Sequence, residues 1–470
     1  NLRPRAPQTC ALPTALHPEL LVLMLPISRL RCKGMTLFCI LQIFFVNLCA
    51  KIRKNTLQDM KTLIDAPDIL HGNIILPASK SISNRALVIR ALSGSAIPID
   101  NVSDCDDSRV VQDALQHMPK VIDIKAAGTA MRFITSFLAT VPGEHIIKGT
   151  ERMHNRPIAV LVDALRSLGA DICYEEKDGF PPLRIQGREL TGGQISLPGN
   201  VSSQYISSLL MIAPTLKQGF TLEMTGDIIS RPYIDMTLAI MRQFGAQAQW
   251  NSEREIRVEA VPYSPTPYYI EGDWSAASYW YEMVALSGDS EAKVVLPGLF
   301  RDSLQGDSAV SELFSQLGVT TTFNKNSVCL TKRACGSEPF VCNMLNQPDL
   351  AQTLMVTCCM MGKHFRISGL QTLRIKETDR IAALQNELGK LGFHIGVDED
   401  DTMFWNGEKE TNTMGSDDIA IDTYEDHRMA MAFAPVALKR DSIIINNPDV
   451  VSKSYPSFWE DMRKAGFKLA

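Results

Sequence analysis

The sequence predicts an α/β fold built from six similar units. One pattern recurs along the chain: a turn, a few small or charged residues, an apolar helix and a short strand. A second set of amphipathic helices lies between these copies, and short β-branched strands separate the helices. The copies begin near Ala78, Gly128, Gly199, Asp273, Asp349 and Asp426. Their lengths are too irregular for a solenoid, so we expect compact α/β units.

Composition excludes several classes of protein. The chain has 470 residues, of which 45% are hydrophobic and 21% charged, so it can bury two or three cores and is not disordered. A formal net charge of -5 gives no general attraction to nucleic acid or to an anionic membrane. The eleven cysteines and eight histidines show no metal-ligand spacing, and the cysteines suggest no disulfide framework.

The first 59 residues differ from the rest. Residues 36–50 form an apolar run with basic residues on both sides. The run is shorter than the ~20 residues that a membrane span needs, and no small-residue cleavage site follows it. An export signal, a membrane anchor and translated upstream sequence are three interpretations; we favour the third, with Met60 as the start of the working protein.

The first copy of the repeat predicts an anion site. The run Ile74 to Leu76 is expected to be a strand and residues 86–92 a helix, so Lys80, Ser81 and Arg85 cluster where the strand leads into the helix. Unpaired backbone N–H groups and the helix dipole favour negative charge at such a place. The pattern is not a P-loop, because the Gly-x-x-x-x-Gly-Lys-Ser/Thr motif is absent.

The second set of helices is mostly closed by glycine, which is typical of a helix C-terminus. These helices are expected at residues 107–118, 156–169, 233–245, 307–318, 377–392 and 455–466. Strands are expected at residues 146–147, 220–224, 294–296 and 443–445.

Two groups of three units form the natural division of the chain. The break falls near Ile270 and Glu271, after a proline-rich stretch at residues 261–267. Two similar lobes imply a cleft between them, and ligand sites favour such interfaces. If the helices of each lobe converge, their N-termini attract a strongly anionic ligand there.

The polar residues at the helix starts form a coherent set. The cations are Lys80, Arg85, Arg132, Arg156, Lys376, Arg380, Arg428 and Lys453. The hydroxyl and amide groups are Ser81, Thr129, Ser202, Ser203, Gln204 and Ser230. The carboxylates are Asp273, Asp349, Glu377, Asp379 and Asp426. Arginine forks and lysine point charges suit phosphate and carboxylate groups, and hydroxyls beside an amide suit a phosphorylated polyol.

Each of these residues also has a purely structural interpretation. Arg132 is a possible partner of Asp426 or of another acid, and Asp273 and Asp426 are possible N-caps. Asp379 is able to pair with a neighbouring helix charge. His427 is better placed as a hydrogen-bonding group than as a base.

Acid-base chemistry is what the set supports, because no nucleophilic Ser-His-Asp or Cys-His pattern and no metal cluster is visible. Asp349 is expected to be ionised and able to accept a proton. Glu377 lies between Lys376 and Arg380 in the sequence, so it acts as an acid only if burial offsets these cations.

Seven ordered motifs resemble those of the 5-enolpyruvylshikimate-3-phosphate (EPSP) synthase family, over about residues 66–470. They are LPASKSISNR at 76–85, GTAMR at 128–132, RPI at 156–158, VSSQ at 201–204, RPYID at 231–235, RIKETDR at 374–380 and DHRMAM at 426–431. The resemblance implies a two-lobed inside-out α/β barrel with six repeated units, three per lobe. It implies lobes at residues 60–77 with 272–470 and at 78–271, the active site between them, and an extension at 1–59 outside the working core.

The resemblance also implies an activity, which is transfer of the enolpyruvyl group of phosphoenolpyruvate to the 5-hydroxyl of 3-phosphoshikimate with release of phosphate, in aromatic amino-acid biosynthesis. Lobe closure is expected to exclude water. No cofactor or metal is implied, the partners are the two small-molecule substrates, and neither nucleic acid nor a membrane is expected. A cytoplasmic monomer is the implied form.

Residue roles follow from the motifs by resemblance. The 3-phosphoshikimate set is Lys80, Ser81, Arg85, Ser202, Ser203, Gln204, Ser230, Asp349 and Lys376. The phosphoenolpyruvate set is Lys80, Gly128, Arg156, Gln204, Arg380, Arg428 and Lys453. The catalytic set is Asp349, Glu377 and Lys80: Asp349 takes the 5-hydroxyl proton, Glu377 protonates the methylene carbon, and Lys80 lies between the two substrates.

Three positions depart from the family pattern. Ala126 and Thr372 stand where many members have Asn, and Phe133 stands where Pro is common. These changes bear on substrate geometry and on the response to glyphosate.

Two alternatives remain open at this stage. The sister enzyme that acts on UDP-N-acetylglucosamine shares the fold and chemistry, but it typically carries a loop cysteine, and residues 140–156 contain none. A non-catalytic anion-binding scaffold would not need the acids and lysine at positions 349, 377 and 453, which are all present.

Overall fold

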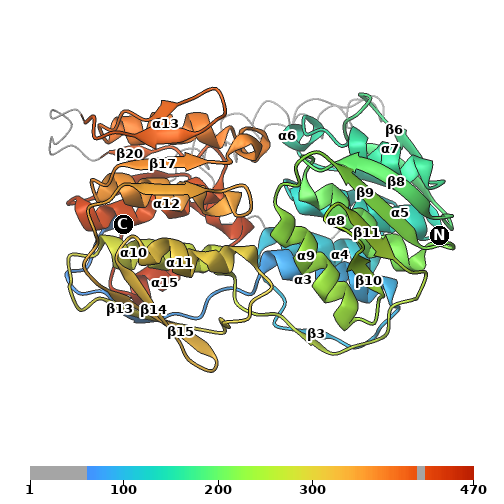
Figure 1. The fold of residues 1–470 in the computed structure, drawn as a ribbon, viewed down its shortest axis with the longest axis horizontal. Coiled ribbons are helices and arrows are strands. Elements are labelled where there is room, and N and C mark those ends of the chain that lie inside the picture. Colours follow the sequence, from blue (N-terminus) through green and yellow to red (C-terminus); the bar gives the residue numbers. More distant parts are fainter. Residues whose placement is uncertain (1–60, 410–418) are drawn as a thin grey trace, which may run out of the picture. The chain divides into compact units, whose positions relative to one another are not determined.

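The computed structural model describes residues 61–409 and 419–470 of the chain. Figure 1 shows its helices and strands in two groups, one mostly yellow to red and one blue to green. One hydrophobic core collects side chains from Ile64 to Leu76 and from Trp274 to Phe467. The other collects side chains from Ala78 to Ile270. We call these two parts the end lobe and the inserted lobe.

The end lobe contains the first two strands and everything after Gly272. Its elements are β1 (Lys61–Asp65), β2 (His71–Asn73), α10 (Trp274–Leu286), β13 (Lys293–Pro297), η3 (Gly306–Ala309), α11 (Val310–Ser315), β14 (Val319–Phe323), β15 (Ser327–Lys332), β16 (Phe340–Asn343), η4 (Pro348–Leu350), α12 (Ala351–Met360), β17 (Phe365–Ser368), η5 (Gln371–Ile375), α13 (Arg380–Lys390), β18 (Gly396–Val397), β19 (Met403–Trp405), β20 (Ala420–Ile421), α14 (His427–Phe433), η7 (Ala434–Lys439), β21 (Ile443–Asn446), η8 (Pro448–Lys453), α15 (Phe458–Lys464) and β22 (Lys468–Leu469).

The inserted lobe lies between the two halves of the end lobe in sequence. Its elements are α3 (Lys80–Leu92), β3 (Ile99–Asp100), α4 (Asp106–His117), β4 (Val121–Asp123), α5 (Gly128–Thr140), β5 (Gly143–Lys148), α6 (Glu151–His154), α7 (Ala159–Ser167), β6 (Asp171–Tyr174), β7 (Leu183–Gly187), β8 (Gly193–Pro198), α8 (Ser203–Ile212), η2 (Ala213–Thr215), β9 (Phe220–Thr225), α9 (Arg231–Gln243), β10 (Ala248–Trp250), β11 (Glu255–Val258) and β12 (Tyr268–Tyr269).

Six small sheets occur in the described residues, three in each lobe. The end lobe has the strand orders β20-β21-β1-β22, β14-β15-β13-β2 and β16-β17-β19-β18, and the inserted lobe has β10-β11-β9-β8, β4-β5-β7-β6 and β12-β3. Strand β1 runs antiparallel to β21, with Ile64 opposite Ile443, and β2 runs parallel to β13. The predicted α/β fold of six units, three per lobe, is confirmed.

The six helices that open the repeats form the centre of each lobe. Helices α3, α5 and α8 contact one another in the inserted lobe, and α10, α12 and α14 do so in the end lobe. Almost every residue of α5, α10, α12 and α14 is buried, as expected for helices that are apolar on all sides. The sheets lie outside them, since strands such as β7 and β9 alternate buried and exposed residues.

Glycine closes the second set of helices as predicted. Gly169, Gly245, Gly318, Gly392 and Gly466 all have positive φ, between 81° and 99°. A residue with a Cβ is strained in this left-handed conformation, so glycine ends these helices at little cost.

The first unit differs from the prediction at its start. The expected strand at Ile74 to Leu76 is wrong: β2 ends at Asn73, and beyond it the Ile74 N–H alone still bonds to the Val295 carbonyl. Helix α3 begins at Lys80 rather than at residue 86, because the Ser79 hydroxyl accepts a hydrogen bond from the Ile82 N–H. The prediction missed the first six residues of this helix because most of them are polar, so they did not extend the apolar pattern.

Three helices of the second set begin later than predicted. Helix α7 begins at Ala159, so Arg156 lies before the helix, and α15 begins at Phe458. The residue before a proline disfavours the helical conformation, which explains why residues 156 and 455 stay outside. Helix α13 begins at Arg380 because Asp379 is its N-cap.

Two paired segments join the lobes. Residues 77–79 and 271–273 lie antiparallel, with a bridge between Ala78 and Gly272. The Ser79 N–H bonds to the Glu271 carbonyl at 2.8 Å, and the Asp273 N–H bonds to the Pro77 carbonyl at 2.9 Å. The first helix of each lobe therefore begins beside this crossing.

Within residues 61–409 and 419–470 no helix is long and apolar enough to cross a membrane. The three interpretations of the N-terminal run at residues 36–50 concern a part of the chain outside the described residues.

Glu282 is a carboxyl group buried in the end-lobe core. Its side chain lies in α10, and the residue has no exposed surface. Burial raises the pKa of Glu282 well above its usual range. The nearby Thr357 hydroxyl donates to the Thr353 carbonyl at 2.7 Å, and neither carboxyl oxygen of Glu282 has a hydrogen-bond partner in the described residues.

We expect Glu282→Gln to raise the free energy of unfolding at neutral pH. A carboxyl group with a raised folded pKa costs nothing below its unfolded pKa, and about 1.4 kcal/mol for each pH unit above it until the folded pKa is reached. Urea denaturation should show the gain at neutral pH and none near pH ~4. Glu312→Gln, at an exposed position of α11, is the control; equal gains in both variants would contradict this account.

Candidate active site

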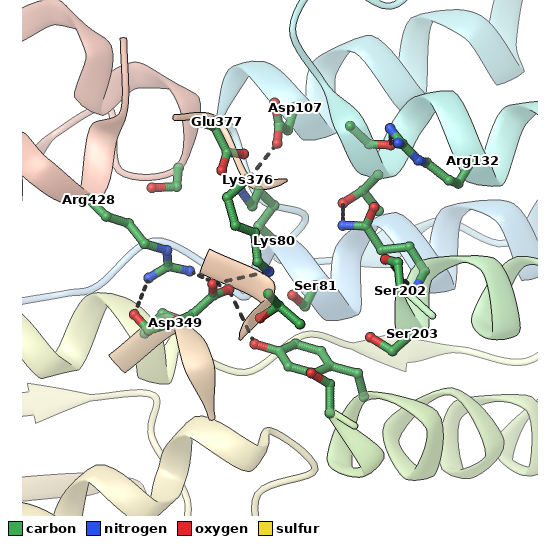
Figure 2. A pocket seen from close by; sticks show the side chains of 18 of the residues that line it. Lys80, Ser81, Asp107, Arg132, Ser202, Ser203, Asp349, Lys376, Glu377 and Arg428 are labelled. Carbon is green, nitrogen blue, oxygen red and sulfur yellow. Dashed lines mark hydrogen bonds and ion pairs between the residues drawn. The ribbon is translucent and has the colours of Figure 1, made fainter. Parts of the chain in front are cut away.

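A cavity lies between the two lobes and is lined by helix starts from both. Its lining residues are Lys80, Ser81, Arg85, Asp107, Gly128, Thr129, Arg132, Arg156, Pro157, Asn200, Ser202, Ser203, Gln204, Tyr205, Ile229, Ser230, Tyr233, Asp273, Ser275, Ala276, Tyr279, Asp349, Thr372, Ile375, Lys376, Glu377, Arg380, His427, Arg428 and Ser454. Figure 2 shows Arg428 and Asp349 on one side of it and Ser202 and Ser203 on the other. Of the predicted site residues, all but Lys453 line this cavity.

Side-chain caps fix where the lining helices begin. Ser79 caps α3 and Ser202 caps α8 in the inserted lobe. Asp273 caps α10 and Asp426 caps α14 in the end lobe, as their structural interpretation predicted. Each cap satisfies one N–H at its helix start, and the dipole of a helix favours an anion at that end.

Asp273 also joins the two lobes. One carboxylate oxygen accepts the Ala276 N–H at 3.1 Å, and the other accepts the Lys80 N–H at 3.1 Å. The carboxylate therefore sits at the first turn of two helices, α10 and α3, that belong to different lobes. This contact fixes the backbone that carries Lys80.

Lys80 is paired with a buried acid that the sequence did not single out. Its Nζ lies 3.1 Å from Oδ2 of Asp107, which belongs to the first turn of α4. Burial lowers the pKa of Lys80, but Asp107, Cys105 and Glu377 together more than offset this, so the net shift is upward. Lys80 is therefore a fixed positive charge at the crossing of the lobes.

Arg380 holds together three carboxylates of the end lobe. Its Nε donates to Asp426 at 2.7 Å, one terminal nitrogen donates to Asp349 at 3.0 Å, and the other donates to Glu377 at 2.9 Å. The arginine is 1% exposed. A buried guanidinium with several carboxylate bonds is held in one orientation, so Arg380 fixes the geometry of this wall.

Asp349 is an ionised carboxylate surrounded by cations. Besides Arg380, it accepts from Nη2 of Arg428 at 2.9 Å, and Nζ of Lys376 lies 3.6 Å away. Burial alone raises the pKa of Asp349, but Arg428, Lys376 and Arg380 hold it well below its usual value. Asp349 is therefore deprotonated at neutral pH and able to accept a proton.

The pKa of Glu377 also depends on burial, which raises it, and on neighbouring cations, which lower it more. Its carboxylate lies 3.1 Å from Nζ of Lys453 and 2.9 Å from Arg380. Although burial favours the protonated acid, these two cations and Arg156 hold the pKa of Glu377 well below its usual value. The burial that an acid role requires is present, but in this arrangement it does not offset the cations.

The inserted lobe contributes hydroxyl and amide groups. Ser202, Ser203 and Ser230 line the cavity, and the Gln204 amide nitrogen donates to the Thr129 hydroxyl at 3.1 Å. Ser230 has φ 53°, and the N–H of this residue bonds to the Leu345 carbonyl of the end lobe at 3.0 Å. This wall is polar and carries few acids.

Arg85 lines the cavity, but most of its hydrogen bonds go to other residues of the inserted lobe. Its guanidinium donates to the Thr237 hydroxyl at 2.7 Å and to the Ser207 hydroxyl at 3.0 Å. It also lies 5.3 Å from the centre of the Phe133 ring. Burial lowers the pKa of Arg85 to about 10, so the side chain stays charged at neutral pH.

Gly128 makes room for Arg156. A Cβ on Gly128 would lie 2.4 Å from Nη1 of Arg156, so any larger residue would displace the guanidinium. The Arg156 side chain makes no hydrogen bond or ion pair with the described residues, in contrast to Arg380 and Arg428. It is a cation at the cavity wall whose donors remain available.

Two structural interpretations are not supported as stated. Arg132 is not the partner of Asp426: its guanidinium donates to the Gly128 and Pro157 carbonyls, while Asp426 is bound by Arg380. His427 lines the cavity with both ring nitrogens buried and without a hydrogen bond to the described residues. Burial lowers the pKa of His427 well below its usual value, so the ring is neutral.

The structural interpretation of Asp379 is supported. Its carboxylate pairs with Arg374 at 3.1 Å, as predicted.

Sequence reasoning missed several cavity residues. Tyr233 donates to Asp349 at 3.4 Å and lies within the RPYID motif, which was the available signal. Ser275 lines the cavity and donates to the buried carboxyl group of Asp307. Burial raises the pKa of Asp307 to about 6. Tyr205 bonds to the Pro157 carbonyl at 2.6 Å. Ser275 and Asp307, like Tyr205 and Pro157, are far apart in the sequence, so no sequence pattern indicated these two contacts.

Replacing Arg380 should show how much this cluster of charges contributes to the free energy of unfolding. We expect Arg380→Ala to lower the free energy of unfolding by about 3–5 kcal/mol, because it leaves the buried Asp426 without its cation and removes one of the cations that bind Asp349 and Glu377. Arg156→Ala removes an equally long cation that bonds to none of the described residues, and it should change stability by less than about 1 kcal/mol. Urea denaturation of both variants measures the difference; similar losses would show that the cluster does not stabilise the lobe.

Comparison with known proteins agrees with this geometry. A family model described as EPSP synthase (3-phosphoshikimate 1-carboxyvinyltransferase) matches residues 64–122 and 117–462. A 3-phosphoshikimate 1-carboxyvinyltransferase of Bacteroides fragilis is 54% identical over 412 residues, which cover 87% of this chain and 99% of the relative. One of Photobacterium damsela subsp. piscicida is 35% identical over 425 residues, covering 84% of this chain and 97% of the relative.

Solved structures show the same fold. The EPSP synthase of Acinetobacter baumannii superimposes with a TM-score of 0.71 at 20% identity, covering 87% of this chain and all of that one. Since the family model and the B. fragilis relative each span most of the chain, the family prediction is confirmed: the chain belongs to the EPSP synthase (3-phosphoshikimate 1-carboxyvinyltransferase) family.

Proposed function

We propose that the chain transfers the enolpyruvyl group of phosphoenolpyruvate to the 5-hydroxyl of 3-phosphoshikimate and releases phosphate. One observation carries this proposal beyond family membership. The ionised Asp349 lies among three cations on one wall of a cavity whose other wall carries hydroxyls and Arg156, which has no side-chain partner in the described residues. This arrangement suits a base that acts on a polyol beside a small dianion.

The acceptor is proposed to bind between the two walls. Lys80, Ser81, Arg85, Ser202, Ser203, Gln204, Ser230, Asp349 and Lys376 form the proposed 3-phosphoshikimate site. The serine hydroxyls and helix starts of the inserted lobe suit the phosphate. Asp349 and Lys376 suit the hydroxyls of the ring, which need an acceptor and a donor.

Phosphoenolpyruvate is proposed to bind beside the acceptor. Lys80, Gly128, Arg156, Gln204, Arg380, Arg428 and Lys453 form this site. Arginine forks suit its carboxylate and phosphate. Lys80, at the crossing of the lobes, lies where it can hold the anions of both substrates against their mutual repulsion.

The reaction is an addition followed by an elimination. Asp349 accepts the 5-hydroxyl proton while that oxygen bonds to C2 of phosphoenolpyruvate, and C3 gains a proton to give a tetrahedral intermediate. A proton of C3 then returns to the Glu377 carboxylate while the bond between C2 and the phosphate oxygen breaks, which releases phosphate. Glu377 is the proposed donor to C3; its low pKa fits this role only once bound anions neutralise Lys453 and Arg380.

We further propose the working boundaries of the protein. Residues 60–77 and 272–470 form one lobe, residues 78–271 form the other, and residues 1–59 lie outside the catalytic core. The enzyme is proposed to work in the cytoplasm as a monomer, on its two small-molecule substrates, with closure of the lobes excluding water.

A phosphate-release assay tests the reaction. Purified protein should release phosphate from phosphoenolpyruvate when 3-phosphoshikimate is present and should not do so with UDP-N-acetylglucosamine. Turnover only with the sugar nucleotide would assign the chain to the sister activity, and turnover with neither would support a binding scaffold.

Asp349→Asn should separate catalysis from binding. The amide keeps the size of the side chain but loses the base, so we expect kcat to fall by about 10² to 10⁴-fold with 3-phosphoshikimate still bound. Calorimetry checks binding and phosphate release checks turnover. Arg156→Ala is the contrasting variant, which should mainly raise the KM for phosphoenolpyruvate. An unchanged kcat in Asp349→Asn would refute the base.

A further inference from the structure

A further contact between the lobes lies next to Lys453 and outside the cavity. The Ser452 hydroxyl donates to Oδ2 of Asp106 at 2.5 Å, across 346 positions of sequence. Ser452 belongs to η8 of the end lobe, and Asp106 is the first residue of α4 in the inserted lobe. Neither residue lines the cavity.

The neighbouring residues show what this contact holds. Nζ of Lys453 donates to the Ala126 carbonyl of the inserted lobe at 3.2 Å and lies 3.1 Å from Glu377. In α4, the residue after Asp106 is Asp107, the partner of Lys80. The first turn of α4 therefore touches one proposed substrate-binding lysine directly and holds the residue that precedes the other.

We propose that the Ser452–Asp106 hydrogen bond is a closure contact that positions Lys453 for phosphoenolpyruvate. Ser452 and Asp106 are positioning residues, since they act on Lys453 through η8 and touch no substrate in the proposed sites. The contact forms only when η8 lies against α4, and in that position Lys453 reaches the inserted lobe. The inference rests on the proposed role of Lys453.

The strength and location of the Ser452–Asp106 hydrogen bond determine how much its loss should weaken substrate binding. Asp106 is exposed, and such a hydrogen bond contributes modestly to a closed state. A ligand that needs the closed state binds more weakly in proportion to the population lost. Because the contact is adjacent to Lys453, the loss should fall on phosphoenolpyruvate more than on 3-phosphoshikimate.

Ser452→Ala tests this without changing any charge. We expect the KM for phosphoenolpyruvate to rise about threefold to tenfold, with kcat and the KM for 3-phosphoshikimate within about twofold of wild type. Asp106→Ala should do the same, and the double variant should be no worse than either single one. Ser452→Thr, which keeps the hydroxyl, should restore the wild-type KM. Asp113→Ala, at an exposed position of α4 without a side-chain bond to the described residues, is the control.

Amide hydrogen exchange reads the contact independently of activity. Residues 448–453 should exchange faster in Ser452→Ala and Asp106→Ala but not in Asp113→Ala. Unchanged exchange would overturn the contact, and faster exchange with both KM values unchanged, or raised equally, would overturn the positioning role. Lys453→Ala, measured in parallel, tests the proposed substrate role itself: a normal KM for phosphoenolpyruvate there would refute that role, while exchange would still decide whether the contact exists.

Discussion

The ion pairs of the buried Arg380 guanidinium are the interactions on which the end-lobe wall of the cavity depends. The guanidinium binds carboxylates from three different segments of the end lobe: Asp349 before α12, Glu377 before α13 and Asp426 before α14. Each carboxylate also has a further partner, which is Arg428, Lys453 or the first turn of α14. One side chain thus sets the relative positions of a proposed base, a proposed acid and a helix cap.

The two walls of the cavity differ in how their charges are satisfied. The end lobe carries cations that are already paired with its own carboxylates, so a bound anion there must exchange one partner for another. The inserted lobe offers helix starts, hydroxyls and Arg156, whose donors have no partner in the described residues. In the proposed complex, an anion that contacts the end lobe would redistribute charge around Asp349 and Glu377. Such a redistribution would change the proton affinity of the two acids.

The sequence predicted the parts of the fold that depend on local chemistry. Glycines with positive φ closed the second set of helices, and aspartates such as Asp273 capped the first set, because both effects act within one turn. It failed where a distant contact decided the structure. Lys80 pairs with Asp107 and Arg132 bonds to carbonyls rather than to Asp426, and no spacing in the sequence encodes these choices. The cavity was predicted as a set of helix starts, whereas its tyrosines were not, although Tyr205 and Tyr233 lie in the first turns of α8 and α9.

The three departures from the family pattern have different physical consequences. At position 126 the backbone carbonyl accepts Lys453, so alanine keeps this contact between lobes and removes only a side-chain amide. The Thr372 hydroxyl is buried at the cavity without a partner in the described residues, so it keeps a polar group available to a ligand. Phe133 is fully buried in α5 and packs its ring against the Arg85 guanidinium. Thr372 therefore bears on the polarity of the cavity, Ala126 on the contact between the lobes, and Phe133 on the packing of Arg85 in α3.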